Sequence, residues 1–533
     1  MHTPAHAIRF LFLSARQAFT GLLLINSTVS AFAASYYVDS SAGVDTNAGT
    51  STAAPWKTLT KVNSKTYVAG DRIYLKAGSV WNGLQLIPKG SGASGNPIII
   101  DLYGSGAKPL INGNGANHNT VYFINQSYWE INNIEVTNNA GSAAINLGDY
   151  RGISINGQNG GTLNHVYIKN CNVHDVTGEV KWIGGDTADN TTGIAFAAGW
   201  DASKRTGGII FETLSSTTKT KFNDVLIEGC TISKCSFAGI SFKQWDGAVH
   251  WGVRGSSGDT NWTPHTNVTI QNNTINQSGS SYACNGIYVT DVKTGTIQNN
   301  VIANSGTCGI EVYYCDAITI QKNEVYGTVK KAGGTDYNGI DPDKGTTNIV
   351  VQYNYSHNNG DGILICNFAG YDSSTIRYNI LQNNSRYGIY LHSANGGNNQ
   401  VYNNVVYSNS ASTKACYGYG NSITGSGVYK IRNNIFYSSV TSASPTTGSG
   451  IAYDYNCYYG MTGVTADAHK VTTNPLFVSA GSGGTGIGTV GGYKLQSTSP
   501  CRNTGTAISS NGGADFWGTT LYNSVADIGA DEY

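Results

Sequence analysis

Charged residues are scarce in this chain. Only 12% of its 533 residues are Asp, Glu, Lys or Arg, whereas soluble domains usually carry about 25%. Basic and acidic residues number 32 each, so no excess of positive charge points to a nucleic-acid partner. Beyond residue 33, no segment approaches the roughly 18 apolar residues that a membrane helix needs. With 40% hydrophobic residues, 68 Gly and 34 Tyr, a chain of this length can still bury a large core.

Residues 1–33 have the features of a secretory signal peptide. Arg9 and Arg16 precede an apolar stretch, 22–25, and Ala31-Phe32-Ala33 is a small-residue pattern of the kind found at cleavage sites. We therefore predict a mature chain that begins near residue 34 and is secreted, either to the cell exterior or to the periplasm. The prediction includes no membrane span.

Ten cysteines are present, but none form the CxxC pairs typical of a zinc site. In an exported protein they could form disulfides, and Cys230/Cys235 and Cys308/Cys315 are the local candidates. Buried thiols are an equally good alternative, because Cys packs well in stacked cores.

A hexad repeats through the middle of the chain. Its copies start 23 to 31 residues apart and read IQNNTI (270–275), IQNNVI (297–302), IQKNEV (320–325), VQYNYS (351–356), IRYNIL (376–381), VYNNVV (401–406) and IRNNIF (431–436). Self-similarity at such a period indicates a solenoid. Short β-branched runs broken by Asn and Gly indicate strands and turns. The repeat therefore predicts an all-β parallel β-helix with one hexad in each coil.

The fourth position of the hexad is Asn in every one of these copies. We expect the flanking Ile or Val to point into the core, and the Asn to lie at a bend where the left-handed conformation is tolerated. Stacked coils would align these side chains into an amide ladder. Earlier copies, IKNCNV (168–173) and IEGCTI (227–232), carry Cys at this position, so the solenoid should begin before residue 170.

The two ends of the chain depart from the repeat. The N-terminal segment containing PWKTL and GDRI suggests a strand, a loop, a short helix from about Pro55 and another strand. Solenoid ends need covering, so we assign this segment to an N-terminal cap within a β-helix domain of residues 34–470. The stretches NPLF, YKLQSTSPC and VADIGADEY predict a C-terminal extension, 471–533, that packs on or caps the coils.

The Asn ladder, the PWKTL and GDRI entry and the terminal DIGADEY resemble secreted bacterial right-handed parallel β-helix proteins of the pectate-lyase-like superfamily. The resemblance covers nearly the whole mature chain and implies a right-handed parallel β-helix. It leaves the reaction open, because the superfamily includes polysaccharide lyases, inverting glycosidases, uronan epimerases and non-enzymatic adhesins.

A second repeat begins with Gly-Ile and marks another strand of each coil. It occurs at 239–241, 286–288, 309–311, 339–341, 362–364 and 388–390. If the Ile points inward, strand alternation sends the next residue outward, and the residue two further on outward as well. The outward pairs are then Ser241 with Lys243, Tyr288 with Thr290, Glu311 with Tyr313, Asp341 with Asp343, Leu364 with Cys366, and Tyr390 with His392.

These columns bring three carboxylates together. Neighbouring parallel strands lie about 4.8 Å apart, so Glu311 and Asp341 should be close neighbours, with Asp343 beside them. Close like charges raise one pKa or recruit a cation, which indicates either a calcium site or a proton-sharing acid/base pair. The alternative is a solvated acidic strand in which Asp343 and Lys344 form an ordinary surface pair.

Residues suited to carbohydrate chemistry surround this patch. Tyr288, Tyr313, Tyr390 and His392 could stack on sugar rings or move protons. The coil from 239 to 286 is unusually long and contains Trp245, and insertions in solenoids often build a wall over the binding face. Alternatively, the tryptophans only pack their own loops.

Two enzyme families share short motifs with this region. Asp341-Pro342 and Asp361-Gly362 match the mannuronan epimerase signature, although Asn338 replaces its Tyr, Asp343 its His and Cys366 an outward Asp. Polygalacturonase-like hydrolases carry Asn-Thr-Asp, Asp-Asp and Gly-His-Gly on consecutive coils. The corresponding stretches here are 334–336, 360–361 and 386–388, without the His.

We predict a secreted, monomeric lyase that cleaves an acidic, uronate-containing polysaccharide by β-elimination. Calcium held by Glu311, Asp341 and Asp343 would acidify the α-proton. Lys243, Tyr313 or His392 would take that proton, and Lys344, Tyr288, Tyr390, Asp361 and Trp245 would contact the substrate. The alternatives are a metal-free inverting glycoside hydrolase with a carboxylate acid/base pair, a uronan epimerase, and a carbohydrate-binding or structural β-helix without turnover.

Overall fold

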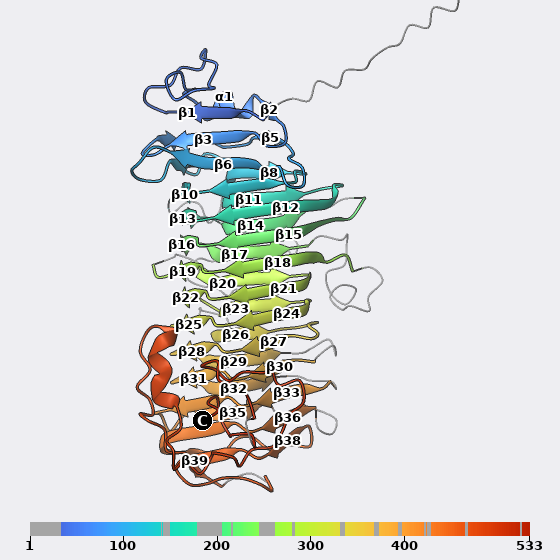
Figure 1. The fold of residues 1–533 in the computed structure, drawn as a ribbon, viewed down its shortest axis with the longest axis vertical. Helices are drawn as coiled ribbons and strands as arrows, with labels where there is room; N and C mark the ends of the chain where they lie inside the picture. Colours follow the sequence, from blue (N-terminus) through green and yellow to red (C-terminus); the bar gives the residue numbers. More distant parts are fainter. Residues whose placement is uncertain are drawn as a thin grey trace, which may run out of the picture. The chain divides into compact units, whose positions relative to one another are not determined.

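The computed structural model is a stack of β-coils (Figure 1). It describes residues 33–533 except 140, 142–149, 179–204, 215–216, 245–261, 280–282, 331–335, 367–372, 393–396, 420–422, 424–427, 464–466 and 523–524. The predicted signal peptide thus lies outside the described residues. No helix in the described part of the chain is long and apolar enough to cross a bilayer.

Three long sheets run along the stack, and every strand pair within them is parallel, as the coil period predicts. Sheet I has 14 strands, namely β1 (Ser35–Val38), β3 (Arg72–Lys76), β6 (Ile98–Tyr103), β9 (Trp129–Asn132), β12 (Gly161–Lys169), β15 (Thr220–Glu228), β18 (His265–Gln271), β21 (Val292–Gln298), β24 (Asp316–Gln321), β27 (Val350–Gln352), β30 (Thr375–Arg377), β33 (Asn399–Tyr402), β36 (Tyr429–Arg432) and β38 (Ile451–Asp454).

Sheet II has 13 strands, namely β4 (Val80–Asn82), β7 (Leu110–Asn112), β10 (Glu135–Asn139), β13 (Asn172–Thr177), β16 (Thr231–Cys235), β19 (Thr274–Asn276), β22 (Val301–Ala303), β25 (Glu324–Tyr326), β28 (Tyr355–His357), β31 (Ile380–Gln382), β34 (Val405–Ser408), β37 (Ile435–Ala443) and β39 (Cys457–Thr462). A separate pair consists of β2 (Thr66–Tyr67) and β5 (Lys89–Gly90).

Sheet III has 10 strands and contains the Gly-Ile repeats. Its strands are β8 (Asn119–Ile124), β11 (Arg151–Gly157), β14 (Gly207–Thr213), β17 (Phe237–Lys243), β20 (Ala283–Thr290), β23 (Cys308–Tyr313), β26 (Asn338–Pro342), β29 (Asp361–Cys366), β32 (Tyr387–His392) and β35 (Lys414–Gly418). The repeat isoleucines, such as Ile310 and Ile340, are fully buried in the core. The predicted parallel β-helix is therefore confirmed.

A buried asparagine ladder joins the hexads of successive coils, as predicted. In each coil, one Asn Oδ1 accepts hydrogen bonds from both the backbone N–H and the side-chain amide of the Asn one coil earlier, as between Asn354 and Asn379 (both 3.0 Å). The ladder ends where the carboxylate of Asp467 accepts from the backbone N–H and the amide of Asn456 (both 3.0 Å). Buried amides need such partners, because each unmade bond costs about 1–3 kcal/mol.

The predicted bend position was wrong by one residue. The left-handed conformation belongs to the third hexad position, for example Asn299 (φ 54°) and Asn433 (φ 54°). The third position also accommodates Lys322 and Tyr353. The fourth-position Asn recurs in the hexads because of its hydrogen bonds instead. Only an amide of this length can both donate to the next coil and accept from the previous one.

All ten cysteines are buried free thiols. The alternative of disulfides at Cys230/Cys235 and Cys308/Cys315 is therefore not the arrangement that forms. Cys230 instead joins the top of the ladder, where its N–H donates to Asn273 (2.9 Å).

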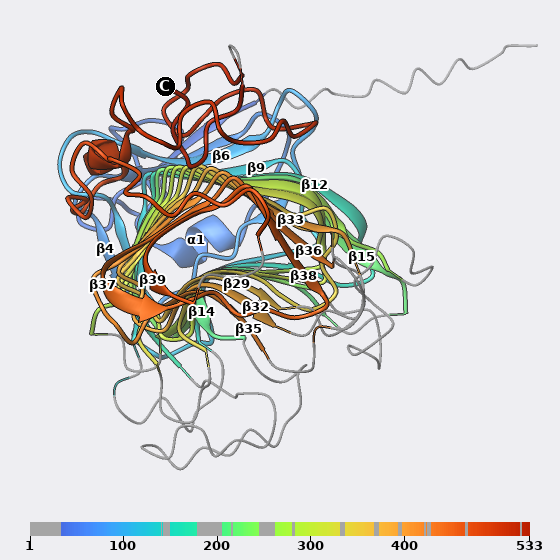
Figure 2. The same cartoon turned by 90° about the horizontal axis from the view of Figure 1, so that it is seen from below.

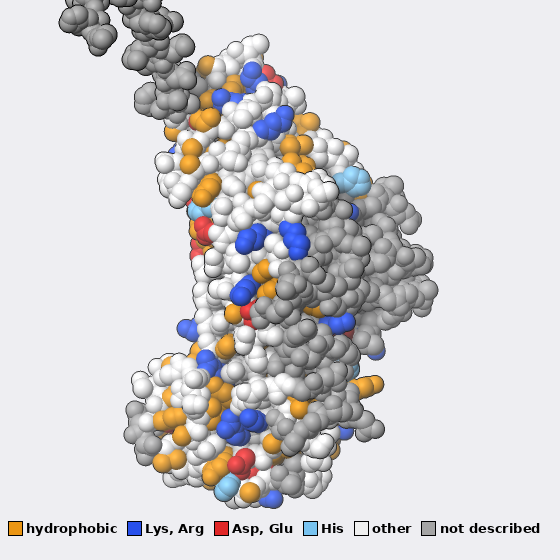
Figure 3. Space-filling model, turned by 90° about the vertical axis from the view of Figure 1, so that its right-hand side faces the viewer, with side chains coloured by type: hydrophobic (Ala, Val, Ile, Leu, Met, Phe, Trp, Pro, Cys, Tyr) orange, Lys and Arg blue, Asp and Glu red, His pale blue; other side chains and the backbone are white. Residues whose placement is uncertain are grey.

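Helix α1 (Leu59–Asn63) begins four residues after the expected Pro55 and is capped by the Thr58 side chain, which accepts from the Lys61 N–H. Leu59 and Val62 belong to the main core, and Figure 2 shows α1 across the space that the three sheets enclose. At the other end, the 3-10 helix η3 (Ile487–Tyr493) packs beside sheet II, where the Tyr493 hydroxyl donates to Gln382 (2.6 Å). On the face in Figure 3 the charged side chains are few and scattered.

Candidate active site

The register of sheet III brings the predicted carboxylates together. Glu311 pairs directly with Asp341, and the N–H of Asp343 donates to the Val312 carbonyl on the neighbouring coil (2.9 Å). Tyr288 pairs with Glu311 one coil earlier. The prediction that Glu311 and Asp341 are neighbours on one outward column is thus confirmed.

Buried amides and a thiol hold two of these carboxyl groups. The side-chain amide of Asn285 donates to Glu311 Oε2 (2.7 Å), and that of Asn338 donates to Asp341 Oδ2 (3.1 Å). The Cys308 thiol lies 3.5 Å from the same Asp341 oxygen. Asp341 Oδ1 is buried with no hydrogen-bond partner among the described residues. Asp341 is therefore rigidly placed but only partly satisfied, which is costly for an ionised carboxylate.

Burial and mutual repulsion change the protonation of the cluster. Burial raises the pKa of Asp341 well above its ordinary range, and the charges of Asp343, Glu311 and Asp336 raise it further. For Asp343, burial and the Glu311 charge raise the pKa to about 8. At neutral pH at least one proton is therefore held in this patch.

Asp336 is a fourth member of the cluster, and the column pattern missed it. It precedes β26 outside any Gly-Ile repeat and is half-buried, and its charge adds to the pKa shifts of Asp341 and Asp343. The available signal was the weak match of 334–336 to the Asn-Thr-Asp motif of hydrolases.

Tyr288 and Tyr313 lie beside the carboxylates but do not face solvent. They are 0% and 6% exposed and belong to an outer apolar cluster with Phe237, Cys284 and Tyr314. Burial raises the pKa of both hydroxyls. The predicted roles of Tyr313 as a proton acceptor and of Tyr288 as an exposed stacking surface do not fit these positions.

Lys243 is too distant for its predicted role as a base. It lies in the outward column of Asp343 but three coils earlier, or about 14 Å at 4.8 Å per coil. It pairs in register with Glu212, and the positive charges of Arg151, Arg205 and Lys243 lower the pKa of that buried Glu212 despite its burial. Lys243 therefore belongs to a separate buried ionic cluster.

His392 and Asp361 lie on the other side of the carboxylates. His392 Nδ1 is 3.5 Å from the Cys366 sulfur, and burial together with the Arg386 charge lowers its pKa. Asp361 is fully buried and forms a bidentate ion pair with Arg386. The predicted catalytic role of His392 and the predicted substrate contact of Asp361 stay predictions.

The last two predicted contacts are Lys344 and Trp245. The backbone N–H of Lys344 donates to Asp343 Oδ1 (2.6 Å), so Lys344 fixes the carboxyl through its main chain, and its half-buried side chain stays a predicted substrate contact. Trp245 lies outside the described residues.

The donor set does not fit the predicted calcium ion. Among the described residues, no group of three or more His, Cys, Asp and Glu side chains is placed to hold a metal. Glu311 and Asp341 already accept bonds from amides, and Asp341 favours its neutral form. Calcium binding stays a prediction.

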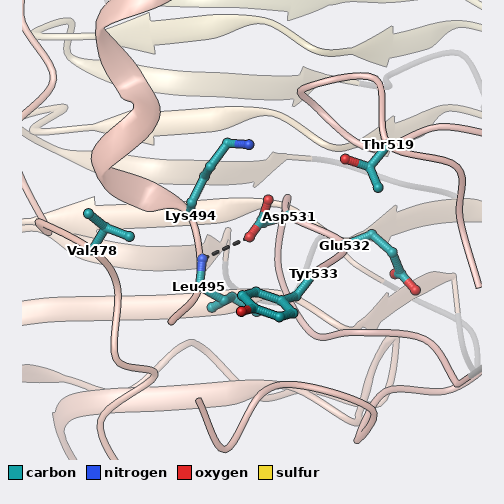
Figure 4. A pocket seen from close by; sticks show the side chains of 7 residues that line it. All are labelled: Val478, Lys494, Leu495, Thr519, Asp531, Glu532 and Tyr533. Carbon is teal, nitrogen blue, oxygen red and sulfur yellow. Dashed lines mark hydrogen bonds between the residues drawn. The ribbon is translucent and has the colours of Figure 1, made fainter. Parts of the chain in front are cut away.

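A cavity of about 330 Å³ lies in the C-terminal extension, not on sheet III. Figure 4 shows its lining, in which the N–H of Leu495 donates to Asp531 (2.8 Å). Glu532 accepts from the N–H groups of Tyr522 and Asp527. These carboxylates therefore hold the chain terminus in place, and the chemistry is better sought on sheet III.

Comparison with known proteins supports the fold. A family model described as a right handed beta helix region matches residues 205–341 and 257–457. The structure is a parallel β-helix, as the sequence predicted, and the family model supports its right-handed winding.

Two further similar proteins are lacto-N-biosidases, and they bear on the predicted reaction of this chain. The lacto-N-biosidase of Bifidobacterium longum subsp. longum is 27% identical over 544 residues, covering 86% of this chain and 32% of that protein. The chain thus spans about a third of that relative's length. A GH136 lacto-N-biosidase from Eubacterium ramulus has the same fold, at 23% identity over 71% of this chain and 64% of that chain, with a TM-score of 0.60.

These relatives overturn the predicted reaction. A lacto-N-biosidase is a glycoside hydrolase, so the prediction of a lyase that acts by β-elimination is wrong. They favour the alternative of a glycoside hydrolase instead.

Proposed function

We propose that this chain is a glycoside hydrolase that releases lacto-N-biose from glycans, with the carboxylate cluster of sheet III as its acid/base machinery. The similarity to a lacto-N-biosidase supports the substrate. The observation that carries the reaction type is the half-buried Asp343, whose pKa is raised to about 8 beside other carboxylates. Glycoside hydrolysis requires one protonated and one ionised carboxyl group.

Asp343 is the proposed general acid. A carboxyl group with a pKa near 8 keeps its proton at neutral pH and can give it to the glycosidic oxygen as the bond breaks. Asp341 is a poorer candidate because it is 2% exposed and tied to Asn338 and Cys308. Asp343 is more accessible, and its position is fixed by the Lys344 N–H.

Asp336 is the proposed ionised partner. It is half-buried two residues before β26, whereas Glu311 is 6% exposed and bonded to Asn285. Its carboxylate would stabilise the positive charge that develops on the sugar ring and supply the attacking electron pair, directly or through a water. If Asp336 attacks directly, the ionised Asp343 takes a proton from the water that then hydrolyses the glycosyl ester on Asp336. If Asp336 activates a water instead, Asp336 takes the proton of that water and Asp343 regains one from solvent.

Glu311 and Asp341 then act as positioning residues. Burial and the charge of Glu311 keep the pKa of Asp343 high, while the buried Asp341 paired with Glu311 favours its own neutral form. The ionised members of this cluster disfavour a polyanionic substrate, because like charges repel at close range. A neutral glycan fits the charge of the cluster better than a uronan does.

The test is hydrolysis of a p-nitrophenyl lacto-N-bioside and of a lacto-N-biose-terminated oligosaccharide by the full chain. Asp343→Asn and Asp336→Asn should each lower kcat at least about 100-fold, because each removes a group that acts in the transition state. For the wild type, kcat/KM should fall as pH rises through about 8. A chelator series in the same assay tests calcium dependence.

Asp101→Asn is the matched control. Asp101 is half-buried and accepts the N–H of the next residue (Leu102, 2.7 Å), as Asp343 does, but it lies on sheet I. The activity of the Asp101→Asn variant should equal that of the wild type. Full activity in Asp343→Asn, or cleavage of neither substrate by the wild type, would refute the proposal. Secretion and a monomeric state are part of the proposal and can be checked by fractionation and by light scattering.

A further inference from the structure

A cluster of tyrosines continues the outward columns of sheet III beyond the carboxylates. Leu364 pairs with Tyr390, and Tyr390 pairs with Tyr417 on β35. Tyr387 stacks on Tyr417 with ring centres 4.3 Å apart and an angle of 13°, and lies 4.9 Å from Tyr390. We call Tyr387, Tyr390 and Tyr417 the tyrosine shelf.

The shelf lies outside the β-helix core. Leu364, Cys366 and Tyr390 form a separate apolar cluster, against which Tyr387 and Tyr417 pack while remaining partly exposed. Beside them Tyr419 is 49% exposed. An apolar surface with hydroxyl groups at its edge is the chemistry that binds sugars, which present both C–H faces and hydroxyl groups.

Arg386 fixes the shelf in place. Its guanidinium carbon lies 4.7 Å from the ring centre of Tyr337 and 5.1 Å from those of Tyr387 and Tyr390. Asp361 holds the guanidinium on its other side. Such buried pairs contribute little net stability, which suggests that this one is kept to orient the rings.

The two sides of the carboxylate cluster differ in access. Toward the N-terminal coils, Phe237, Tyr288, Tyr313 and Tyr314 are all at most 6% exposed. Toward the C-terminal coils, Leu364, Cys366 and Tyr390 are at most 8% exposed. Beyond these three, Tyr387, His392 and Tyr417 are only partly buried. At 4.8 Å per coil, Tyr390 and Tyr417 lie about 10 and 14 Å from Asp341 along the column, a distance comparable to a disaccharide.

We infer that the tyrosine shelf is the sugar-binding subsite of this protein, so that the glycan runs along sheet III from the carboxylates toward β35. The ligand class is a neutral oligosaccharide that contacts the rings through its C–H faces and the tyrosine hydroxyls. The inference rests on the proposed function for the choice of ligand, and its test therefore measures binding as well as turnover.

The experiment compares Tyr417→Ala and Tyr387→Ala with the wild type. Aromatic contacts are worth about 0.5–1.5 kcal/mol beyond buried area, so KM for the oligosaccharide should rise about 3- to 10-fold in each, with kcat within about twofold. Tyr417→Phe keeps the ring and should change KM less than Tyr417→Ala. Tyr459→Ala is the matched control, because Tyr459 is a half-buried tyrosine in a ring pair with Tyr437 on sheet II, and it should leave KM unchanged.

Binding of lacto-N-biose is then titrated calorimetrically with Asp343→Asn, alone and combined with Tyr417→Ala. The double variant should bind about 3- to 10-fold more weakly than Asp343→Asn. Circular dichroism verifies that each variant is folded. If the wild type hydrolyses the glycan but the shelf variants match Tyr459→Ala in KM and affinity, the subsite is refuted and the hydrolase stands. If the wild type binds lacto-N-biose through the shelf without hydrolysing it, the subsite stands and the hydrolase does not.

Discussion

The raised pKa of Asp343 predicts that removing this acid stabilises the protein, in a pH-dependent way. Asp343→Asn keeps the shape of a neutral carboxyl group but cannot ionise. The folded-state pKa of about 8 lies above the ordinary value of 3.8, so the folded state retains a proton that the unfolded chain loses. This contribution to stability is complete below pH 4 and is lost as pH rises through 8.

The size of the effect follows from the shift. A difference of one between the folded-state and unfolded-state pKa corresponds to about 1.36 kcal/mol. The difference of about four for Asp343 therefore sets an upper limit near 5 kcal/mol. Neighbouring carboxyl groups share the same protons, and Asp343 is only half-buried. We therefore expect Asp343→Asn to gain about 2–4 kcal/mol over the wild type at pH 9 and about zero at pH 4.

Urea unfolding followed by tryptophan fluorescence at pH 4, 7 and 9 measures this difference as a shift in the midpoint. Asp101→Asn should show no gain that grows with pH in the same way. If Asp343→Asn gained no stability between pH 4 and pH 9, the carboxyl group would ionise freely in the fold. The assignment of Asp343 as the proton donor would then be untenable.

Two more predictions concern the fold. Asn354→Ala removes a buried amide whose two N–H groups are shared among three acceptors, the carbonyls of Ile320 and Gln352 and the side-chain oxygen of Asn379. This should cost about 2–4 kcal/mol, seen as a lower Tm. Asn276→Ala changes an exposed Asn and should be nearly neutral, so equal Tm values for the two variants would contradict the role of the ladder. Burial raises the pKa of Asp531 to about 6 and of Glu532 to about 7, so docking of the C-terminal segment should weaken as pH rises through 6–7. Hydrogen exchange, corrected for its intrinsic rate, should show more opening of this segment at pH 8.5 than at pH 5.5. If Glu532→Gln kept the full difference between the two pH values, ionisation of Glu532 would not be its cause.

The fold and the carboxylate patch could be predicted because both depend on strict repetition. The hexad fixes one coil per repeat, and the Gly-Ile strands fix which side chains point outward, so Glu311 and Asp341 were placed by alternation alone. The chemistry of the patch was not predictable in this way, because it depends on how deeply each carboxyl group is buried by other coils.

The residues that were missed lie where the repetition fails. Asp336 precedes its strand, and Tyr417 lies on β35, whose sequence KACYG lacks the Gly-Ile pair. Tyr288 and Tyr313 lie in the predicted outward columns, but they are buried because they pack in one apolar cluster with Phe237, Cys284 and Tyr314. The predicted role of Lys243 as a base also conflicts with the coil count, because three coils separate Lys243 from Asp343.

The asparagine ladder has a direction, and this gives the solenoid a definite way to change length. Each rung donates from its amide to the oxygen of the next coil, and Asp467 closes the series with acceptors only. If a coil were duplicated and inserted between two ladder asparagines, its own Asn would accept from the amide of the preceding coil and donate to the side-chain oxygen of the following coil. A coil appended after Asp467 would meet a side chain that has no amide N–H and whose oxygens already accept from Tyr455, Asn456, Tyr458 and His469. Growth by duplication is therefore open within the stack and closed at its end.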